Sequence, residues 1–445
     1  MENIVIIGNG IAGVSAARHI RKLSDKRIVI VSAETDYFFS RTALMYVYMG
    51  HMKFEHIQPY ENWFWEKNRI ELIRGFVNKV DTENKQLMLD GSRALHYDKL
   101  IIATGSKPNK FGWPGQDLHG VQGLYSKQDL DLMEINAPNK RAVIVGGGLI
   151  GIEMAEMLRS RDIPVTFLVR ETSFWNGVLP EGESAMINEH IKEHHIDLRL
   201  ATNLKEIKAD AHGRVKSIII QETGEELDCD LVGLTAGVSP NVDFLKDSNI
   251  ELGRGVKVNR FLETNVADVY AIGDCAEQHE PIGNRRPIEA VWYTGRMMGE
   301  TVAQTICGNK IEYKPGHWFN SAKFLDIEYQ TYGWVFSERG KKEEEQHFHW
   351  RHAKENICIT MAYHKDTNLF LGLNTFGIRM RHEVFDRWLT EERSADFVME
   401  HLADANFDPE FFKHHEKSII AAYNSDTGKS LKGKKKSLKR IFQLT

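Results

Sequence analysis

The sequence predicts an α/β protein in which two three-layer domains, each built on a parallel sheet, precede a smaller α+β domain. Two β-branched runs, at residues 4–7 and 142–145, each lead into a glycine-rich turn and then a helical pattern. Beyond about residue 311 aromatic and polar residues alternate, which is typical of antiparallel strands. The length of 445 residues exceeds one ordinary core and agrees with several domains.

The first glycine-rich turn has the spacing of a dinucleotide-binding βαβ unit. Residues 4–13 read IVIIGNGIAG, with Gly8, Gly10 and Gly13 in the pattern GxGxxG. The first glycine permits a tight turn, the second lets the backbone approach a pyrophosphate, and the third lets helix and strand pack closely. Glu34 follows the next β-branched run, where a carboxylate suits a pair of ribose hydroxyls. These residues predict a Rossmann-like domain that binds a dinucleotide.

A second turn repeats the pattern. Residues 142–151 read AVIVGGGLIG and contain Gly146, Gly148 and Gly151. The strand that follows, 165–169, ends at Arg170 and Glu171. An acid at this place favours NAD, whereas an arginine favours the 2′-phosphate of NADP, so both remain open and the earlier position of Arg170 tilts the balance to NADPH. Two dinucleotide sites in one chain predict hydride transfer between a flavin and a nicotinamide.

Further motifs strengthen a family resemblance. They are SAETDYFFSRTAL at 32–44, LIIATG at 100–105, GVSPN at 237–241 and VYAIGDC at 269–275. Together with the two turns, they resemble the flavoproteins with two dinucleotide-binding domains, the pyridine nucleotide-disulfide oxidoreductase superfamily. The likeness covers roughly residues 3–335. It is closest to the branch of rubredoxin and ferredoxin reductases, NADH oxidases and the flavoprotein part of NAD(P)H–nitrite reductases.

The resemblance implies FAD in the first Rossmann-like fold and NADH or NADPH in the second. The residues implied for FAD are Gly8, Gly10, Gly13, Glu34, Arg41, Ala103, Thr104, Gly105, Gly273 and Asp274. Those implied for NAD(P) are Gly146, Gly148, Gly151, Arg170 and Glu171. Asp274 would hold the ribityl chain, and Glu153 would lie near the nicotinamide as the catalytic residue. A helix over 287–300 would point its positive N-terminus at the flavin.

The resemblance also implies the domain boundaries. An FAD-binding domain would comprise 1–120 and 236–310, an NAD(P)-binding domain 121–235, and an α+β interface domain 311–425. Residues 426–445 form a basic tail that we expect to be disordered, on a chain whose formal net charge is −5. The tail could contact an acidic redox protein or an anionic membrane surface, or simply be solvated.

The segment beside the flavin lacks the cysteines of the disulfide reductases in this superfamily. Residues 40–44 read SRTAL, and the four cysteines are Cys229, Cys275, Cys307 and Cys358. Cys275 is interpreted as a packing residue. Without a thiol relay, electrons must pass directly to an acceptor, and an iron–sulfur or haem protein, a quinone, oxygen or a small organic molecule would serve.

The function predicted is that of an FAD-dependent NAD(P)H oxidoreductase that supplies a separate, rubredoxin-like or ferredoxin-like protein or a quinone. An NAD(P)H oxidase or small-molecule reductase is one alternative, and a redox-sensing binding protein like apoptosis-inducing factor is another. The acidic body argues against nucleic-acid binding. The few cysteines and the absence of a signal peptide predict a cytoplasmic protein, and a homodimer is left open.

One histidine cluster has two interpretations. His347, His349 and His352 have near-alternate spacing, which suits zinc or copper ligands and equally a solvent-facing strand. We favour the strand, and no metal site is predicted.

Overall fold

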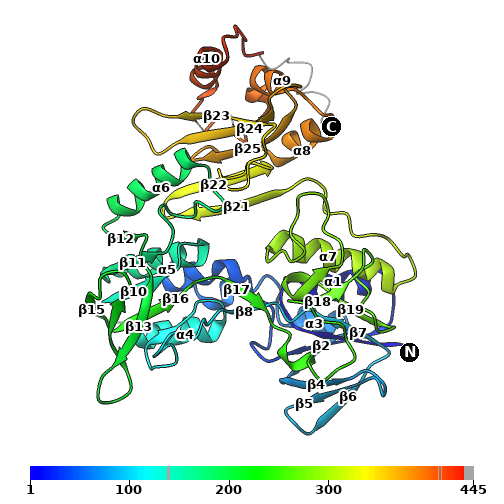
Figure 1. The fold of residues 1–445 in the computed structure, drawn as a ribbon. Coiled ribbons are helices and arrows are strands. Elements are labelled where there is room, and N and C mark those ends of the chain that lie inside the picture. The colour runs from blue at the N-terminus through cyan, green and yellow to red at the C-terminus, as the bar shows by residue number, and fades with distance from the viewer. Residues whose placement is uncertain (138–140, 409, 412, 435–445) are drawn as a thin grey trace. The chain divides into compact units, whose positions relative to one another are not determined.

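The computed structural model describes residues 1–137, 141–408, 410–411 and 413–434, which fold as two compact units (Figure 1). The first unit, unit 1, comprises Met1–Val145, Met157–Pro164 and Leu204–Pro315. The second, unit 2, comprises Gly146–Glu156, Val165–Asn203 and Gly316–Thr445. Within the described ranges, no helix is long and apolar enough to cross a membrane.

Unit 1 is built on a five-stranded sheet in the order β19-β7-β1-β2-β3, in which every neighbouring pair is parallel. Its strands are β1 (Asn3–Ile7), β2 (Arg27–Ser32), β3 (Ile70–Arg74), β7 (Lys99–Ile102) and β19 (Val269–Ala271). All five residues of β1 are buried, as expected for a parallel strand covered on both faces. The predicted α/β class is therefore confirmed.

Two helices of unit 1 pack closely against each other, α1 (Ile11–Leu23) and α7 (Trp292–Ile306). Gly299 makes this approach possible, because a Cβ atom there would lie 2.5 Å from the carbonyl oxygen of Ala12. The antiparallel strands β4 (Val77–Asp81) and β5 (Gln86–Leu89) contribute Val77, Val80, Leu87 and Leu89 to the same core. Leu95 of the neighbouring β6 (Arg93–His96) packs against it.

Unit 1 also holds a second parallel set of strands in the order β10-β16-β9. These are β9 (Val121–Gln122), β10 (Ala142–Val145) and β16 (Leu231–Leu234). Helix α4 (Lys127–Asn136) starts at a capping box in which Ser126 and Asp129 each bond the other's backbone. The antiparallel strands β13 (Leu204–Ala209), β14 (Val215–Ile220) and β15 (Glu226–Asp228) complete this part, and β8 (Ser106–Pro108) pairs with β17 (Val238–Pro240).

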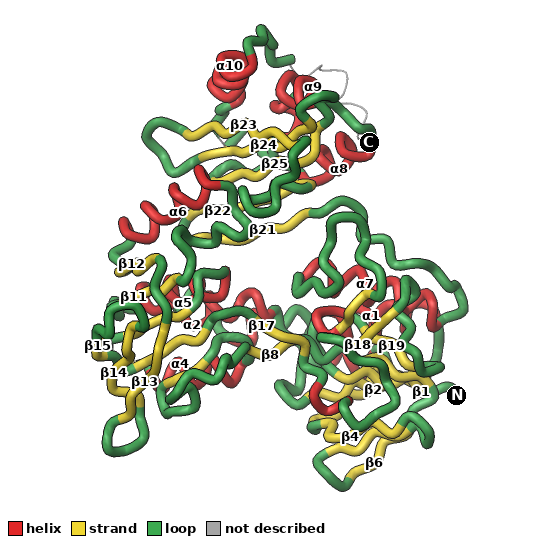
Figure 2. The backbone as a smooth tube through the Cα atoms, in the orientation of Figure 1, coloured by secondary structure: helices red, strands yellow, loops and turns green. Residues whose placement is uncertain are grey.

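Unit 2 contains a five-stranded antiparallel sheet in the order β21-β22-β25-β24-β23 (Figure 2). Its strands are β21 (Phe319–Phe324), β22 (Ile327–Gly333), β23 (Glu345–Arg351), β24 (Cys358–His364) and β25 (Phe370–Phe376). Its buried side chains form one core with helices α8 (His382–Thr390), α9 (Ala395–Glu400) and α10 (Glu416–Thr427). In sequence the unit begins with helix α5 (Leu149–Arg159) as far as Glu156. The parallel strands β11 (Val165–Val169) and β12 (Asp197–Leu200) follow.

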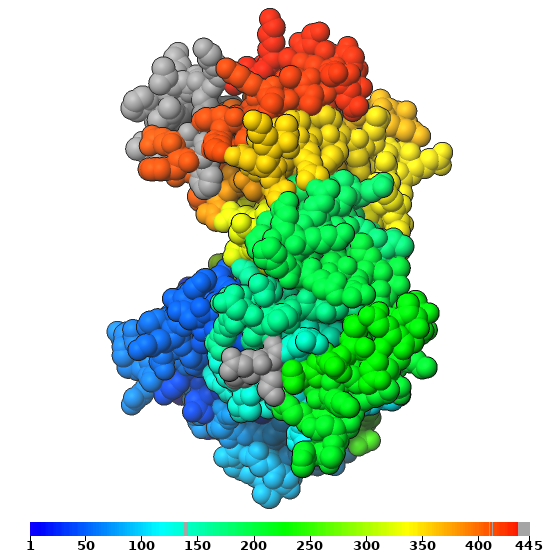
Figure 3. Space-filling view, turned by 90° about the vertical axis from the view of Figure 1, so that its left-hand side faces the viewer, coloured from blue at the N-terminus to red at the C-terminus, as the bar shows by residue number. Residues whose placement is uncertain are grey.

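Helix α6 (Glu181–Glu193) packs against the same antiparallel sheet. Asn374 of β25 donates a hydrogen bond of 2.9 Å to the buried carboxylate of Glu183. The green surface of α6 accordingly adjoins the yellow surface of the sheet in the space-filling view (Figure 3). This contact places a carboxyl group with no exposed surface between helix and sheet.

Two boundaries differ from the sequence-based expectations. The helix expected over 287–300 begins only at Trp292, because Glu289 is held by Arg285 at 2.9 Å and accepts a bond from Thr294, so that the preceding residues form a loop. At the other boundary, α10 extends into the expected tail as far as Thr427.

The first described residues of the basic tail are paired with acids. Lys429 lies 2.6 Å from Asp396, and Lys434 lies 2.7 Å from Glu400. Asn424 accepts the backbone N–H of Leu431 and so turns the chain back after α10. Residues 435–445, which hold the rest of the tail, lie outside the described residues.

The buried Glu183 predicts a pH-dependent stability. Burial raises the pKa of Glu183 to about 7, although hydrogen bonds from Thr360 and Asn374 oppose this change. A carboxyl group whose pKa is higher in the folded state stabilises the fold below its unfolded pKa of 4.5, and that stabilisation is lost as pH rises toward 7. For the wild type, this loss in the free energy of unfolding amounts to about 3 kcal/mol. We expect Glu183→Gln to abolish it, so that the variant is most stabilised relative to wild type above pH 7.

Urea unfolding at several pH values checks this expectation. Glu189→Gln is the matched control, because Glu189 is an exposed acid of the same helix. Parallel pH profiles for wild type and Glu183→Gln would contradict it.

Candidate functional site

The first glycine-rich turn lies between β1 and α1 and is tightly confined on one side. Gly8 has φ of +113°, and a Cβ atom there would meet the carbonyl oxygen of Ala103 at 2.2 Å. A Cβ atom at Gly13 would lie 2.2 Å from the carbonyl oxygen of Gly8. Side chains are therefore excluded at both positions by neighbouring backbone, whatever the turn binds.

Gly10 is different, because no heavy atom lies within 4 Å of its hypothetical Cβ. It is the N-cap residue of α1, and no side chain caps that helix end. An uncapped N-terminus offers backbone N–H groups and the positive end of the helix dipole. The open space and the uncapped helix end fit a pyrophosphate.

The ATG segment returns the chain to this turn. Ala103 donates its N–H to Ile7 at 2.9 Å, and Gly105 adopts φ of +67°. Thr104 donates its hydroxyl to the carbonyl of Asn241 at 2.7 Å, while Asn241 donates its N–H to Gly105 at 2.9 Å. The predicted motifs at 100–105 and 237–241 are therefore in direct contact.

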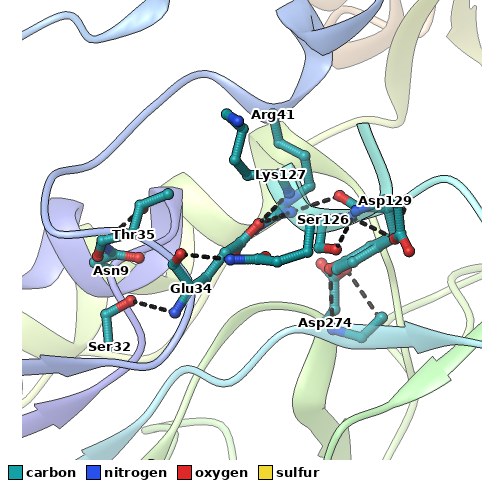
Figure 4. A network of polar contacts seen from close by, with 12 residues as sticks. Asn9, Ser32, Glu34, Thr35, Arg41, Ser126, Lys127, Asp129 and Asp274 are labelled. Carbon is teal, nitrogen blue, oxygen red and sulfur yellow. Dashed lines mark hydrogen bonds and ion pairs between the residues drawn. The ribbon is translucent and has the colours of Figure 1, made fainter. Parts of the chain in front are cut away.

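Glu34 and Arg41 form a bidentate ion pair, with Nη2–Oε2 and Nη1–Oε1 distances of 2.6 and 2.9 Å. The Lys127 N–H donates to Glu34 Oε1 at 2.9 Å, and the Arg41 guanidinium lies 4.6 Å from the Tyr125 ring centroid. Figure 4 shows the Glu34 and Arg41 side chains directed toward each other beside Lys127. Burial lowers the pKa of Arg41, but the bonds to Glu34 outweigh it and raise that pKa overall. The two residues predicted separately for FAD thus act as one charged pair.

Asp274 lies in the 3-10 turn Gly273–Cys275 and belongs to the same network. Its Oδ2 accepts hydrogen bonds from the Ser106 hydroxyl at 3.1 Å and the Tyr125 hydroxyl at 3.3 Å. Burial raises the pKa of Asp274, and these bonds oppose the change. Burial likewise raises the pKa of Tyr125, so its hydroxyl stays a donor. The carboxylate is half buried and can accept further bonds from a ligand hydroxyl.

Three residues of this network were not predicted from the sequence. Asn9 is buried and donates to the carbonyl of Thr35 at 2.9 Å, so it holds the strand-end loop that carries Glu34. Its position between two glycines of the first turn was the available signal. Tyr125 and Ser106 carry no local signal, because both act through contacts with residues far away in the sequence.

In the second glycine-rich turn, as in the first, one glycine lies against other atoms and another has open space at its Cβ position. Gly146 has φ of +120°, and a Cβ atom at Gly147 would lie 2.6 Å from Cγ1 of Val169. Nothing lies within 4 Å of the Cβ position of Gly148, and Gly151 is buried in the first turns of α5. The residues fit a second dinucleotide phosphate.

Arg170 and Glu171 directly follow β11 and pair with each other at 2.9 Å. The side chain of Arg170 is 77% exposed, whereas that of Glu171 is 23% exposed. The arginine is therefore accessible to a ribose phosphate. The less exposed Glu171 is suited to ribose hydroxyls.

Glu153 is half buried on α5. Burial, and then the nearby charge of Glu156, raises its pKa to about 7. Glu156 itself pairs with Lys323 at 2.8 Å. A carboxyl group with a pKa near neutrality can hold or release a proton at working pH, which is a property of functional carboxyls.

All four cysteines are unpaired, and Cys229, Cys275 and Cys358 are buried. The Cys275 thiol donates to the carbonyl oxygens of Ile272 and Ile102 at 3.3 and 3.4 Å. Burial raises the pKa of Cys275, which keeps it a thiol. Its surroundings are those of a packing residue and not of a reactive thiolate.

The three histidines near β23 do not share a site. His349 bonds the Thr360 hydroxyl at 2.9 Å, and His352 accepts the backbone N–H of Glu355 at 3.0 Å. The ring nitrogens of His347 are buried, and desolvation with the charge of Lys341 lowers its pKa to about 4. Among the described residues these histidines form no metal-binding group.

Residues 2–303 match the family model described as pyridine nucleotide-disulphide oxidoreductase. The chain belongs to this family. Its members use FAD and a nicotinamide dinucleotide, and they are oxidoreductases. Both glycine-rich turns and the Asp274 network fall within the matched residues.

Individual relatives agree with this membership. The chain is 29% identical over 320 residues to the assimilatory nitrate reductase electron transfer subunit of Bacillus subtilis, covering 71% of this chain but only 40% of that protein. It is 30% identical over 335 residues to the 5,5′-dehydrodivanillate O-demethylase ferredoxin reductase subunit of a Sphingobium strain, covering 74% and 81%. The fold resembles that of a ferredoxin reductase from Rhodopseudomonas palustris, with a TM-score of 0.77, 22% identity and coverage of 92% and 96%.

The open space at Gly10 generates a test of the first turn. The backbone of Gly10 has φ of −72°, which valine adopts, so Gly10→Val fills only the space above the helix end. We expect the purified variant to fold but to bind FAD at least about tenfold more weakly, which corresponds to about 1.4 kcal/mol. The ratio of flavin to protein absorbance measures this loss.

Gly177→Val is the matched control, because nothing lies within 4 Å of that Cβ position either. Equal flavin content in the two variants would refute the assignment of the turn.

Proposed function

We propose that this chain is an FAD-dependent NAD(P)H oxidoreductase that delivers electrons to a separate acceptor, without a redox-active disulfide. The observation that carries the proposal is the combination of two dinucleotide turns with a cysteine-free segment at 40–44. In that segment Arg41 pairs with Glu34, and Ser40 contacts the hydroxyl of Thr42. The residues of the first turn would hold FAD, which would supply a two-electron hydride acceptor that can release electrons singly.

The residues around the first turn have separable roles in this proposal. The N-terminus of α1 binds the pyrophosphate through backbone N–H groups. The Arg41–Glu34 pair positions the adjoining ribose, because Lys127 and Tyr125 hold both side chains in place. Asp274 would accept bonds from the ribityl hydroxyls, which can reach the half-buried carboxylate whose pKa burial raises.

The residues of the second turn bind and orient the nicotinamide dinucleotide. Gly148 leaves room for the phosphates at the start of α5, and Glu171 or Arg170 contacts the adenosine ribose. Glu153 lies beside the nicotinamide ring in this proposal. Its pKa of about 7 allows a neutral carboxyl to donate a hydrogen bond to the carboxamide.

The acceptor proposed is a small iron–sulfur protein of the rubredoxin or ferredoxin kind, with a quinone as the second choice. Supporting this choice, a ferredoxin reductase subunit is among the relatives of which the chain covers most of the length. An oxidase or small-molecule reductase, and a redox-sensing binding protein, are the outcomes that the following experiments distinguish.

Anaerobic stopped-flow reduction with NADH and then NADPH tests the donor side. We expect rapid bleaching of the flavin absorbance by at least one nucleotide. If Arg170 binds a 2′-phosphate, Arg170→Ala should weaken NADPH binding by about 1.5–3 kcal/mol, or tenfold and more, and leave NADH unchanged. Arg27→Ala is the control, since Arg27 forms a comparable surface pair with Glu71.

The outcomes separate the alternatives. Absence of bleaching by both nucleotides, in protein that holds FAD, would refute the proposal. Fast reduction followed by reoxidation only with ferricyanide or an iron–sulfur protein supports a protein acceptor. Equally fast reoxidation by oxygen identifies an oxidase, and slow turnover with every acceptor identifies a sensor.

The absence of a cysteine pair beside Arg41 makes a further prediction. Anaerobic titration with dithionite should consume two electrons per FAD, because no disulfide in the described part of the chain can store a further pair. Prior treatment with iodoacetamide should leave the rate of flavin reduction by NAD(P)H unchanged. Uptake of four electrons, or inactivation by the alkylating agent, would show that a cysteine takes part.

A further inference from the structure

A cluster of two histidines and one aspartate lies at the C-terminal end of α6, away from both glycine-rich turns in sequence. His190 and His194 are four residues apart, so their side chains share one face of the helix, with ring centroids 4.3 Å apart. Asp326 belongs to the two-residue turn between β21 and β22. Its Oδ1 lies 2.6 Å from Nε2 of His190 and 3.6 Å from Nε2 of His194.

We propose that these three side chains bind one divalent transition-metal ion of the zinc class. One ligand atom from each lies within 4.8 Å of the others. Nitrogen and oxygen ligands bind zinc at about 2.0–2.2 Å, so neighbouring ligands of a tetrahedral site are about 3.4 Å apart. The His194–Asp326 distance already fits, and the shorter His190–Asp326 hydrogen bond need lengthen by only about 1 Å to admit the ion.

The tautomer of His194 favours this assignment. The Nδ1 of His194 lies 3.0 Å from the backbone carbonyl oxygen of His190, which can only accept a hydrogen bond. His194 therefore carries its proton on Nδ1 when neutral, and its Nε2 presents a lone pair toward Asp326. A simple His190–Asp326 hydrogen bond accounts for one of the two histidines but not for the direction of that lone pair.

Two further polar side chains lie beside the other ring nitrogen of His190. Its Nδ1 lies 3.5 Å from the carboxylate of Glu193 and 3.1 Å from the amide nitrogen of Asn356, which itself donates to Glu193. Without a metal, Nδ1 accepts a hydrogen bond from the Asn356 amide and Nε2 donates to Asp326. Metal binding at Nε2 moves the proton to Nδ1, so Asn356 must cease to donate there and Glu193 becomes the hydrogen-bond acceptor of the ring. A carboxylate behind a ligating histidine is the usual arrangement that fixes the ring and raises its basicity.

The cluster is exposed to solvent on one side. The side chain of His190 is 5% exposed, that of His194 36% and that of Asp326 72%. Three protein ligands with an open side leave a coordination position for water. Two imidazoles and one carboxylate select zinc, cobalt, nickel or copper over calcium and magnesium, which prefer oxygen ligands. A bound ion would fasten the β21–β22 turn to α6.

Titration of the full-length, EDTA-treated protein with Zn²⁺ by calorimetry tests the proposal, with Co²⁺ absorption as a second readout. We expect a stoichiometric zinc site and visible Co²⁺ bands of four-coordinate or five-coordinate geometry. His194→Ala and Asp326→Asn should each weaken Zn²⁺ binding at least tenfold and remove the bands. Glu193→Gln should weaken it by about tenfold, as outer-shell changes do.

His195→Asn is the matched control and should bind Zn²⁺ like wild type. His195 is the exposed neighbour of His194 with φ of +57°, a conformation that asparagine tolerates. Melting temperatures measured in EDTA verify that every variant folds. Zinc affinity that is equal in wild type, His194→Ala and Asp326→Asn, or no zinc binding by the wild type, would overturn the proposal. None of these readouts depends on FAD or NAD(P)H.

Discussion

The backbone of the first glycine-rich turn lies against the end of β7, and this close approach organises the rest of unit 1. A single Cβ atom at Gly8 would overlap the carbonyl oxygen of Ala103, and one at Gly13 would overlap Gly8 itself. The overlap involves backbone on both sides, so no side-chain rearrangement relieves it. β1, α1 and the ATG segment therefore meet here through backbone contacts that require glycine. Gly10, between these two glycines, has open space at its Cβ position.

A network of charges is built around this turn. Arg41 neutralises Glu34 in a partly buried, bidentate pair, which is stronger and more directional than a single ion contact. Asp274 has no such counter-charge in direct contact and depends on the hydroxyls of Ser106 and Tyr125. The pair is thus satisfied by the protein, whereas Asp274 has capacity for a ligand. This difference assigns orientation to the pair and direct binding to Asp274 in the proposed function.

In unit 2, ionisable side chains join a helix to an antiparallel sheet. Glu183 is buried between α6 and β25 with a raised pKa, and His190 on the same helix reaches Asp326 at the turn of β21 and β22. Both contacts join α6 to the antiparallel sheet. A proton on Glu183, or a metal ion held by His190 and Asp326, would each strengthen the contact between α6 and the sheet. The cohesion of unit 2 is therefore expected to respond to pH and to zinc.

The sequence by itself determined the α/β class, both glycine-rich turns, the absence of cysteine near Arg41 and the family, because these depend on residues adjacent in the chain. The contact of Glu34 with Arg41 was not evident, although each residue was predicted, since a spacing of seven in a loop sets no geometry. Tyr125, Ser106 and the pairing of His190 with Asp326 were decided only by the tertiary structure. Their partners are 149, 168 and 136 residues away, and no local pattern encodes contacts that depend on how whole strands and helices pack.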